Sequence, residues 1–171
     1  MPAHGSHVMT DRTRRRTVLR SIGVATTAGL LAGCSTDTGD GDGSGDGGPS
    51  AVDPPSAVDD YLSGDPEANN YDGDMMDYTD AGAPTVEVGA GEGLAFGPAA
   101  VKVSTGTTVT WEWTGQGGDH NVVHQDEAFN SGSAVDEEGH TFEHTFDEAG
   151  TFLYYCGPHQ TVGMKGAVVV E

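Results

Sequence analysis

The sequence predicts an all-β protein: the last 88 residues, 84–171, are expected to fold as a small antiparallel β-sandwich. Two observations predict it. Short runs rich in β-branched and aromatic residues alternate with turn residues at close spacing, and several runs place apolar residues at every second position. No long apolar pattern of helical period competes with this one. We therefore expect a sandwich with a modest core, which a bound metal would help to stabilise.

Seven runs in this region are expected to be strands. Their ranges are 85–88, 100–103, 107–113, 120–123, 141–146, 151–156 and 166–171. Alternation over 107–113 places Trp111 and Trp113 on the inward side, where we interpret them as core residues. Alternation over 151–156 places Cys156 inward and Tyr155 outward.

Residues 56–83, upstream of the sandwich, are expected to form one short helix and a connecting loop. Val58, Tyr61 and Leu62 stand at helical spacing behind Ser56, a favourable N-cap, and we expect this helix to dock on the domain. Residues 64–82 are rich in Asp, Asn and Gly, which predicts a loop without regular structure. Met75 and Met76 are expected to be loop or docking residues, and no chemistry is assigned to this loop.

Residues 34–55 are expected to be a flexible linker. From 35 to 49 every residue is Ser, Thr, Asp, Gly or Pro, a composition that has no apolar surface to bury. Fifteen such residues have a root-mean-square reach of roughly 20 Å. The linker is long enough to hold a small domain just off a membrane surface.

Residues 1–33 are interpreted as an export signal. A basic stretch is followed by an apolar stretch, 21–33, and then by Cys34, which are the successive sections of a secretory signal. The run 15–20, Arg-Arg-Thr-Val-Leu-Arg, resembles a twin-arginine signal, and Leu-Ala-Gly-Cys at 31–34 resembles a lipobox, whose cysteine receives a lipid. The plain alternative is that Cys34 is a small residue of an ordinary signal.

The charge of the chain excludes two classes of function. The chain has 27 acidic and 7 basic residues, a net charge of −20, and five of the basic residues lie within the first twenty positions. From Cys34 onward, 26 acidic residues face two lysines, a balance of −24, so we predict no nucleic-acid partner. The longest apolar run has 13 residues, fewer than the roughly 20 that a plain membrane span needs.

A cluster of metal-binding residue types lies between the last two expected strands. Cys156, His159 and Met164 form a C-x2-H-x4-M run, short enough to place three side chains around one ion. Thiolate and imidazole suit copper or zinc, and a thioether favours copper. The set lacks a second imidazole, and His120 at the end of an earlier strand is the candidate.

These residues and their spacing resemble the blue copper proteins of the plastocyanin type, or cupredoxins. The runs 58–62, 106–115 and 163–171 are further similar to those of the halocyanins, the haloarchaeal branch of that family. The resemblance covers nearly everything after the linker. It implies an eight-stranded Greek-key sandwich and one type 1 copper ion that alternates between Cu(I) and Cu(II).

The resemblance also implies roles for individual residues. His120, Cys156 and His159 would be the trigonal ligands and Met164 the weak axial ligand. Asn121 would brace the ligand loop and hydrogen-bond toward the Cys156 sulfur. In the family a tyrosine at the position of Tyr155 marks a second electron route, unless it is an ordinary exposed aromatic residue. Apart from the resemblance, we expect His159 to be the port for electrons, because its ring edge should reach the surface through the loop around Pro158 and Val162.

Three other histidines are not assigned to this metal. His124, four residues beyond His120, leaves a second metal position open but fits a polar residue at a strand end better. His140 and His144 flank Phe142 and are expected to be surface groups or satisfied core groups.

Two other classes of function are weighed against an electron carrier. A copper enzyme generally builds its second copper site from His-x-His pairs, which the sequence lacks, and a binuclear centre needs two clustered cysteines, whereas only Cys156 follows Cys34. We therefore predict no enzyme. A non-redox copper-binding module at the cell surface, a sensor or chaperone, stays open as the alternative.

Together these features predict a one-electron carrier at the outer face of the cell membrane. It would be anchored by a lipid on Cys34 and would exchange electrons with membrane-bound donor and acceptor proteins of a respiratory chain. The acidic surface indicates a source where salt is concentrated.

Overall fold

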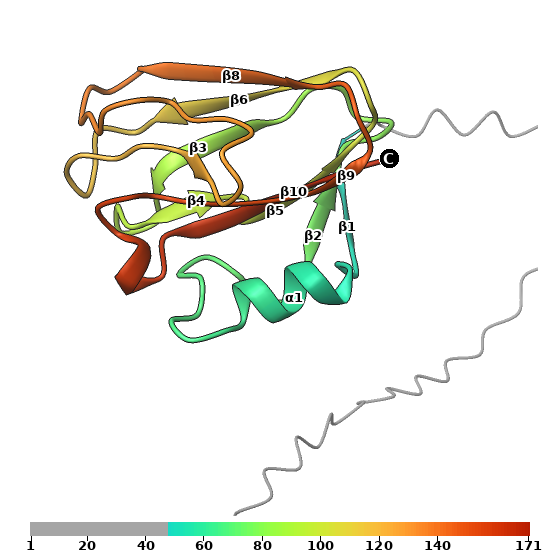
Figure 1. Cartoon of the computed structure of the whole chain (residues 1–171), viewed down its shortest axis with the longest axis horizontal. Helices are drawn as coiled ribbons and strands as arrows, with labels where there is room; N and C mark the ends of the chain where they lie inside the picture. Colours follow the sequence, from blue (N-terminus) through green and yellow to red (C-terminus); the bar gives the residue numbers. More distant parts are fainter. Residues whose placement is uncertain (1–47) are drawn as a thin grey trace, which may run out of the picture. The chain divides into compact units, whose positions relative to one another are not determined.

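Two β-sheets face each other across a core in the computed structural model, which describes residues 48–171 (Figure 1). The predicted signal, Cys34 and nearly all of the 35–49 tract lie outside the described residues. The elements are β1 (Ser50–Val52), α1 (Ser56–Leu62), β2 (Met75–Asp77), β3 (Thr85–Ala90), β4 (Ala95–Gly97), β5 (Ala100–Val103), β6 (Thr107–Trp113), β7 (Val123–His124), β8 (Thr141–Phe146), β9 (Gly150–Tyr155), the 3-10 turn η1 (Gln160–Val162) and β10 (Lys165–Val170).

One sheet has six strands in the order β1-β2-β5-β10-β9-β7, and the other has four in the order β4-β3-β6-β8. Three neighbouring pairs, β2/β5, β5/β10 and β3/β6, run parallel, and the other pairs run antiparallel. The expected β-sandwich is therefore present but mixed rather than purely antiparallel. The chain crosses between sheets at several connections, which places strands of like direction side by side.

The strands that follow residue 84 number eight within the described part of the chain, as the resemblance implied. β5, β6 and β8 have the predicted bounds, and β3, β9 and β10 differ by one or two residues at their ends. β4 was not among the predicted runs. The predicted strand 120–123 is wrong, because regular pairing covers only β7 while His120 makes an isolated bridge with Val135.

The segment before the sandwich is more ordered than its composition predicts. β1 and β2 pair with each other, and β2 joins the edge of the larger sheet beside β5, so residues 50–52 and 75–77 are strands rather than linker and loop. Helix α1 forms over the predicted residues, but Pro55 occupies the N-cap position and no side chain caps the helix, so the expected Ser56 cap is wrong.

Helix α1 docks on the outer face of the six-stranded sheet, below β5 and β10 in Figure 1. Val58 and Leu62 from the helix pack with Met75 from β2, which confirms docking for Met75. On the sheet side the contact surface is made of small residues, which allow the helix to approach closely: Ala99, Ala100, Ala167 and Val169. In residues 48–171 no helix combines the length and apolarity needed to cross a membrane.

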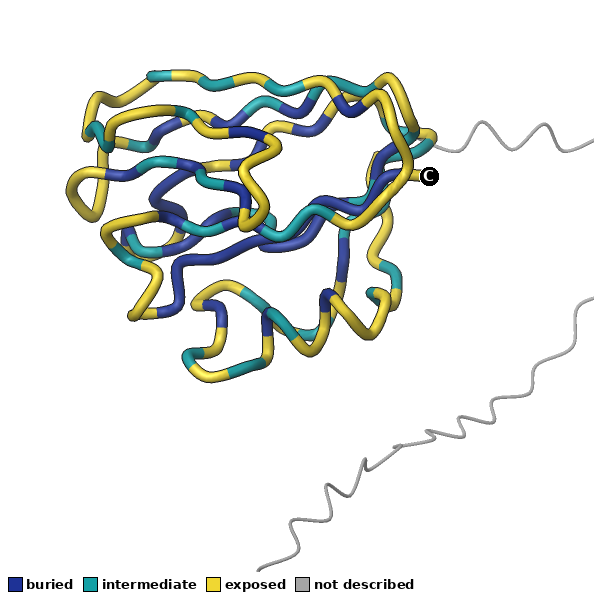
Figure 2. Tube along the Cα trace, viewed as in Figure 1, coloured by how far each residue is buried: buried dark blue, intermediate teal, exposed yellow. Residues whose placement is uncertain are grey.

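The main core lies between the two sheets. Trp111 and Trp113 are fully buried, as predicted, and Trp111 packs edge to face against Tyr154 with ring centroids 5.5 Å apart. Figure 2 shows β10 buried along its whole length, because the core covers one of its faces and α1 covers part of the other. Burial on both faces explains why β10 reads as a nearly continuous apolar run.

The docking of α1 can be tested by truncating a helix side chain. We expect Leu62→Ala to lower the free energy of unfolding by about 2–5 kcal/mol, because it leaves a cavity in a fully buried contact. Asp60→Ala, at an exposed position of the same helix, is the control and should change stability by less than about 0.5 kcal/mol. Urea unfolding of the copper-free protein measures both. Equal stability of the two variants would contradict docking.

Candidate metal centre

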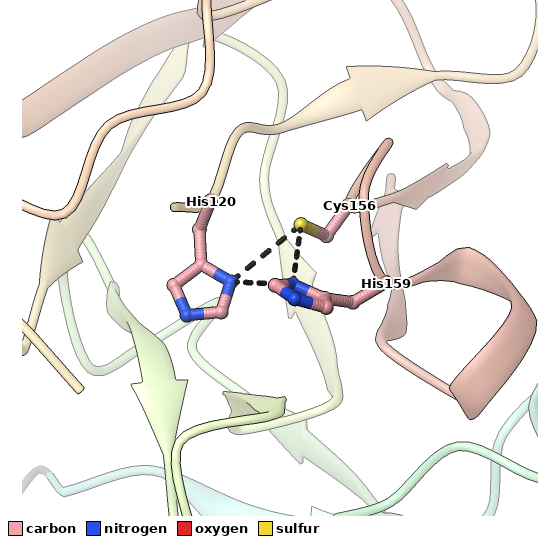
Figure 3. Close-up of side chains that lie close together, drawn as sticks. All are labelled: His120, Cys156 and His159. Atoms are coloured by element: carbon pink, nitrogen blue, oxygen red, sulfur yellow. Dashed lines mark hydrogen bonds between the residues drawn. The ribbon is translucent and has the colours of Figure 1, made fainter. Parts of the chain in front are cut away.

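Three donor atoms converge at the end of the sandwich opposite to the C-terminus (Figure 3). The Cys156 sulfur lies 3.6 Å from the His120 Nδ1 and 3.6 Å from the His159 Nδ1, and the two nitrogens are 3.1 Å apart. His120 comes from the connection between β6 and β7, whereas Cys156 and His159 come from the connection between β9 and β10. The structure therefore brings together three residues that the sequence analysis proposed as ligands.

The triangle of donor atoms fits one metal ion. Given these three separations, a point equidistant from the atoms lies about 2.0 Å from each, close to the length of a metal–imidazole bond. Two imidazole nitrogens and one sulfur in a trigonal arrangement form the donor set of blue copper sites. The chemistry of the donors and their spacing both fit copper.

The orientation of the His120 ring is fixed by a backbone carbonyl. The His120 Nε2 lies 2.7 Å from the Gln116 carbonyl oxygen, and since a carbonyl only accepts, Nε2 carries the proton. The Nδ1 atom is then an unprotonated acceptor that faces the Cys156 sulfur. Gly89 makes room for this arrangement, because a Cβ there would lie 2.6 Å from the Gln116 oxygen. The Gln116 carbonyl thus selects the ring tautomer that a metal requires.

The backbone of His120 is held equally firmly. His120 and Val135 exchange two backbone hydrogen bonds of 2.8 and 2.9 Å, and the Trp113 indole nitrogen donates to the His120 carbonyl at 3.1 Å. The indole is buried in the core, so this bond joins the candidate ligand directly to the rigid interior of the protein.

The loop that carries the other donors is closed on itself. The Cys156 N–H donates to the Met164 carbonyl at 3.0 Å, and the Met164 N–H donates to the His159 carbonyl at 3.2 Å. Gly163 ends the η1 turn with a φ of 87°, a conformation that favours glycine. Met164 is fully buried within the main core cluster, which also contains Cys156.

Asn121 joins this loop to a neighbouring one. Its Oδ1 accepts a 2.8 Å hydrogen bond from the Gly157 N–H, and its Nδ2 donates to the Gly132 carbonyl at 3.1 Å. The side chain therefore braces the ligand loop, as the resemblance implied.

Burial shifts the pKa values of two of the candidate ligands, Cys156 and His120. It raises the pKa of the Cys156 thiol, an effect that backbone hydrogen bonds from Asn121 and His159 partly oppose. It also lowers the pKa of His120, while the hydrogen bond to Gln116 opposes that shift. The imidazole is thus kept neutral and ready to bind, whereas the thiol must lose its proton when a metal binds.

The remaining candidate residues lie around this centre. His159 is half-buried, whereas His120 and Cys156 are buried, so the His159 ring faces the outside of the site. Tyr155 is half-buried and lies between the buried Tyr154 and Cys156, which agrees with the predicted alternation.

The other three histidines pack among aromatic rings. The ring centroid of His124 lies 5.0 Å from that of Phe129, the His144 ring is 4.9 Å from the same phenylalanine, and His140 stacks edge-on to Trp113 at 4.8 Å. The His124 Nδ1 accepts backbone N–H bonds from Asp126 and Ala128. The predicted strand-end role of His124 fits these contacts.

The fold and the donor set define a cupredoxin, and the sequence agrees. Residues 83–171 match the family of copper binding proteins, plastocyanin/azurin family. The chain belongs to this family of blue copper proteins.

Relatives refine the family assignment. Halocyanin of Natronomonas pharaonis is 50% identical over 167 residues, which cover 95% of this chain and 100% of that protein. Plastocyanin of Scenedesmus fuscus is 39% identical over 97 residues, covering 51% of this chain and 98% of that protein. A solved mutant plastocyanin of fern covers 51% of this chain and 99% of its own, with 27% identity and a TM-score of 0.44. The resemblance to the halocyanins is thereby confirmed.

The protein is accordingly a copper-binding electron carrier of the cupredoxin family, with a site of the His-Cys-Met type. Copper would be held by His120, Cys156 and His159, with Met164 as the fourth donor. When bound, the ion supplies a reversible one-electron couple. The individual ligand assignments stay predictions, which substitutions can test.

Residues that act through the backbone could not be found from the sequence. The Gln116 carbonyl orients His120 and the absence of a Cβ at Gly89 leaves room for it, yet any residue type supplies a carbonyl. The glycine-rich stretch 115–118 was the only visible signal of unusual backbone near His120.

The role of the thiolate is tested by Cys156→Ser. We expect loss of the intense blue absorption of the copper-loaded protein, because a hydroxyl oxygen cannot replace the sulfur–copper charge transfer. Visible absorption after addition of one equivalent of Cu(II) measures it. An unchanged blue spectrum in this variant would refute the ligand assignment.

The role of the thioether is tested by Met164→Leu. The variant should keep its copper but show a higher reduction potential, because a weaker axial donor favours Cu(I). Leucine preserves the apolar volume of a fully buried side chain, so the fold should persist. Spectroelectrochemical titration measures the potential. A fall would show that Met164 does not have the axial role.

Proposed function

We propose that the protein passes single electrons between membrane-bound donor and acceptor proteins of a respiratory chain. The observation that carries this proposal is the convergence of His120, Cys156 and His159 on one point at the end of a rigid sandwich. A donor set between the preferences of Cu(I) and Cu(II) needs little rearrangement when an electron arrives or leaves.

The exposure of the site supports His159 as the port for electrons. His159 is the half-buried member of the three, and the neighbouring Val162 is 48% exposed. A small apolar contact around the His159 ring would let a partner approach the metal without displacing much bound water. Such encounters are weak and transient, as is usual for redox partners.

A site with four protein donors also supports transfer rather than catalysis. Catalytic metal sites keep a position open for water or substrate, whereas His120, Cys156, His159 and Met164 would together fill the coordination of one copper ion. We therefore propose that the protein is not an enzyme. A non-redox sensor or chaperone is separated from a carrier by redox cycling of the bound metal.

The charge of the described surface constrains the partners. Lys102 forms ion pairs with Asp77 at 3.3 Å and Glu171 at 2.8 Å, and Lys165 is buried, so both lysines of residues 48–171 are engaged internally. The surface left for docking is acidic, which disfavours acidic partners at low salt. In molar salt the Debye length is about 3 Å, and this preference disappears.

We further propose that the protein is held at the outer face of the cell membrane by a lipid on Cys34. The support is the sequence of the signal and its lipobox. A single acyl chain binds a membrane only marginally, so stable attachment needs a second chain or a second contact. The Ser-, Thr-, Asp-, Gly- and Pro-rich tract 35–49 would then let the domain reach its membrane-bound partners.

One experiment tests transport and anchoring together. The full chain and its Cys34→Ser variant are each expressed in a host that exports and lipidates proteins with such signals. Membrane and soluble fractions are then separated. We expect the unchanged chain with the membranes and the variant in the soluble fraction. Both should bind copper, because Cys34 lies far along the chain from the donor residues.

Reduction is then measured by adding each blue protein to isolated membranes and a respiratory electron donor. We expect the blue colour to bleach in both cases, and faster than without membranes. Copper protein that stays oxidised would contradict the electron-carrier role. A Cys34→Ser variant that still sediments with the membranes would show that the signal is uncleaved or that another anchor holds the protein there.

A further inference from the structure

The docked segment, residues 56–71, makes several of its polar contacts with the loop that carries the candidate ligands and with the strand ends beside it. The Tyr61 hydroxyl donates to the Tyr154 carbonyl at 3.0 Å, two residues before Cys156. The Lys165 ammonium, directly after Met164, donates to the carbonyls of Tyr61 at 2.5 Å and Gly64 at 3.1 Å. The segment therefore forms hydrogen bonds with both ends of the ligand loop, at Tyr154 and at Lys165.

Asn69 contacts the loop between those stems. Its backbone N–H donates to the Gly163 carbonyl at 3.0 Å, and its side-chain Nδ2 donates to the Val162 carbonyl at 2.8 Å. The same nitrogen also donates to the Leu94 carbonyl at 2.7 Å, in the connection between β3 and β4. One side chain thus joins the end of the η1 turn, immediately before Met164, to the opposite sheet.

The backbones at this contact are packed as closely as glycine permits. A Cβ on Gly163 would collide with the Glu67 carbonyl oxygen and would lie 3.1 Å from the Asn69 Oδ1. This close packing leaves the loop little room to move toward the docked segment, and the Asn69 bonds resist movement away from it. Contacts in both directions therefore restrict residues 162–164.

We propose that the docked segment is a brace for the copper loop and that Asn69 is its positioning residue, which fixes the place of the Met164 thioether. This inference rests on the proposed axial role of Met164. An axial thioether bond to copper is long and weak, so the protein rather than the metal decides where the sulfur lies. The reduction potential depends on that donor, and the brace would therefore help to set it.

The sandwich alone does not supply this contact. Asn69 lies outside residues 83–171, the part that matches the family, and reaches the copper loop only because α1 docks on the six-stranded sheet. The buried contacts of Val58, Leu62 and Ala68 hold the segment in place, and the polar contacts of Asn69 use that position. The loop 64–82, to which the sequence assigned no chemistry, thus contains a residue that positions the copper loop.

The test compares Asn69→Leu with Asn70→Leu. Leucine has a similar size but cannot donate, and Asn70 is a matched control because its Nδ2 donates to Phe96 in β4 at 3.2 Å, away from the ligand loop. Both asparagines are exposed, so each variant should fold with only a small loss of stability. Should leucine cause aggregation, Asn69→Asp and Asn70→Asp remove the same donors and add equal charge.

The first readout is amide hydrogen exchange in the copper-free protein. We expect faster exchange over residues 159–165 in Asn69→Leu and unchanged exchange there in Asn70→Leu. The second readout is the reduction potential of the copper-loaded protein. It should rise in Asn69→Leu, in the same direction as in Met164→Leu, because a released loop lets the thioether move away from the ion.

Three results would overturn or limit the brace in distinguishable ways. Equal exchange in both variants would show that the Asn69 side chain does not hold the loop. Faster exchange with an unchanged potential and spectrum would show a structural role only and refute the positioning role. Failure of the copper assignment itself would appear separately, as blue colour retained by Cys156→Ser, and would leave the exchange result intact.

Discussion

The rest of the structure depends on keeping three electron-rich donor atoms closer together than they would stay unaided. The Nδ1 atoms of His120 and His159 lie 3.1 Å apart, and the Cys156 sulfur lies 3.6 Å from each of them. Because the donors come from two separate connections, β6–β7 and β9–β10, they keep these distances only where the surrounding backbone is rigid. The protein supplies that rigidity from the core outward: the Trp113 indole donates to the His120 carbonyl, and the two backbone hydrogen bonds with Val135 fix the segment around His120.

Rigidity is also what an electron carrier requires. A site that does not change shape between two oxidation states has little to rearrange, and each brace around the ligands works toward that end. The Asn121 side chain joins the ligand loop to the loop that contains Gly132, and the Gln116 carbonyl fixes the His120 ring. The Asn69 side chain contacts the ligand loop from the side of α1. These contacts are hydrogen bonds to backbone carbonyl or amide groups, so they constrain where the loop lies with few demands on the residue types within it.

Strands that bury one face could be predicted from the sequence, whereas strands that form only by pairing at a sheet edge could not. The period-two strands β5, β6 and β8 were predictable because each buries one face and the pattern records it. β2 was not, since three residues within an Asp- and Gly-rich stretch become a strand only by pairing with the edge at β5. The strand expected over 120–123 does not form, although its residues favour one. The Val122 N–H donates to the Ser131 hydroxyl instead of to a neighbouring strand.

The sequence by itself determined the donor types, their order along the chain and the family, because cysteine, histidine and methionine at these spacings restrict the chemistry of a metal strongly. It also determined the excess of acidic residues. Only the tertiary structure decided which nitrogen of His120 faces the sulfur, and that the segment around Asn69 reaches the copper loop. These features rest on backbone carbonyls, which every residue possesses, and on the docking of α1 against a distant sheet, so no local pattern can encode them.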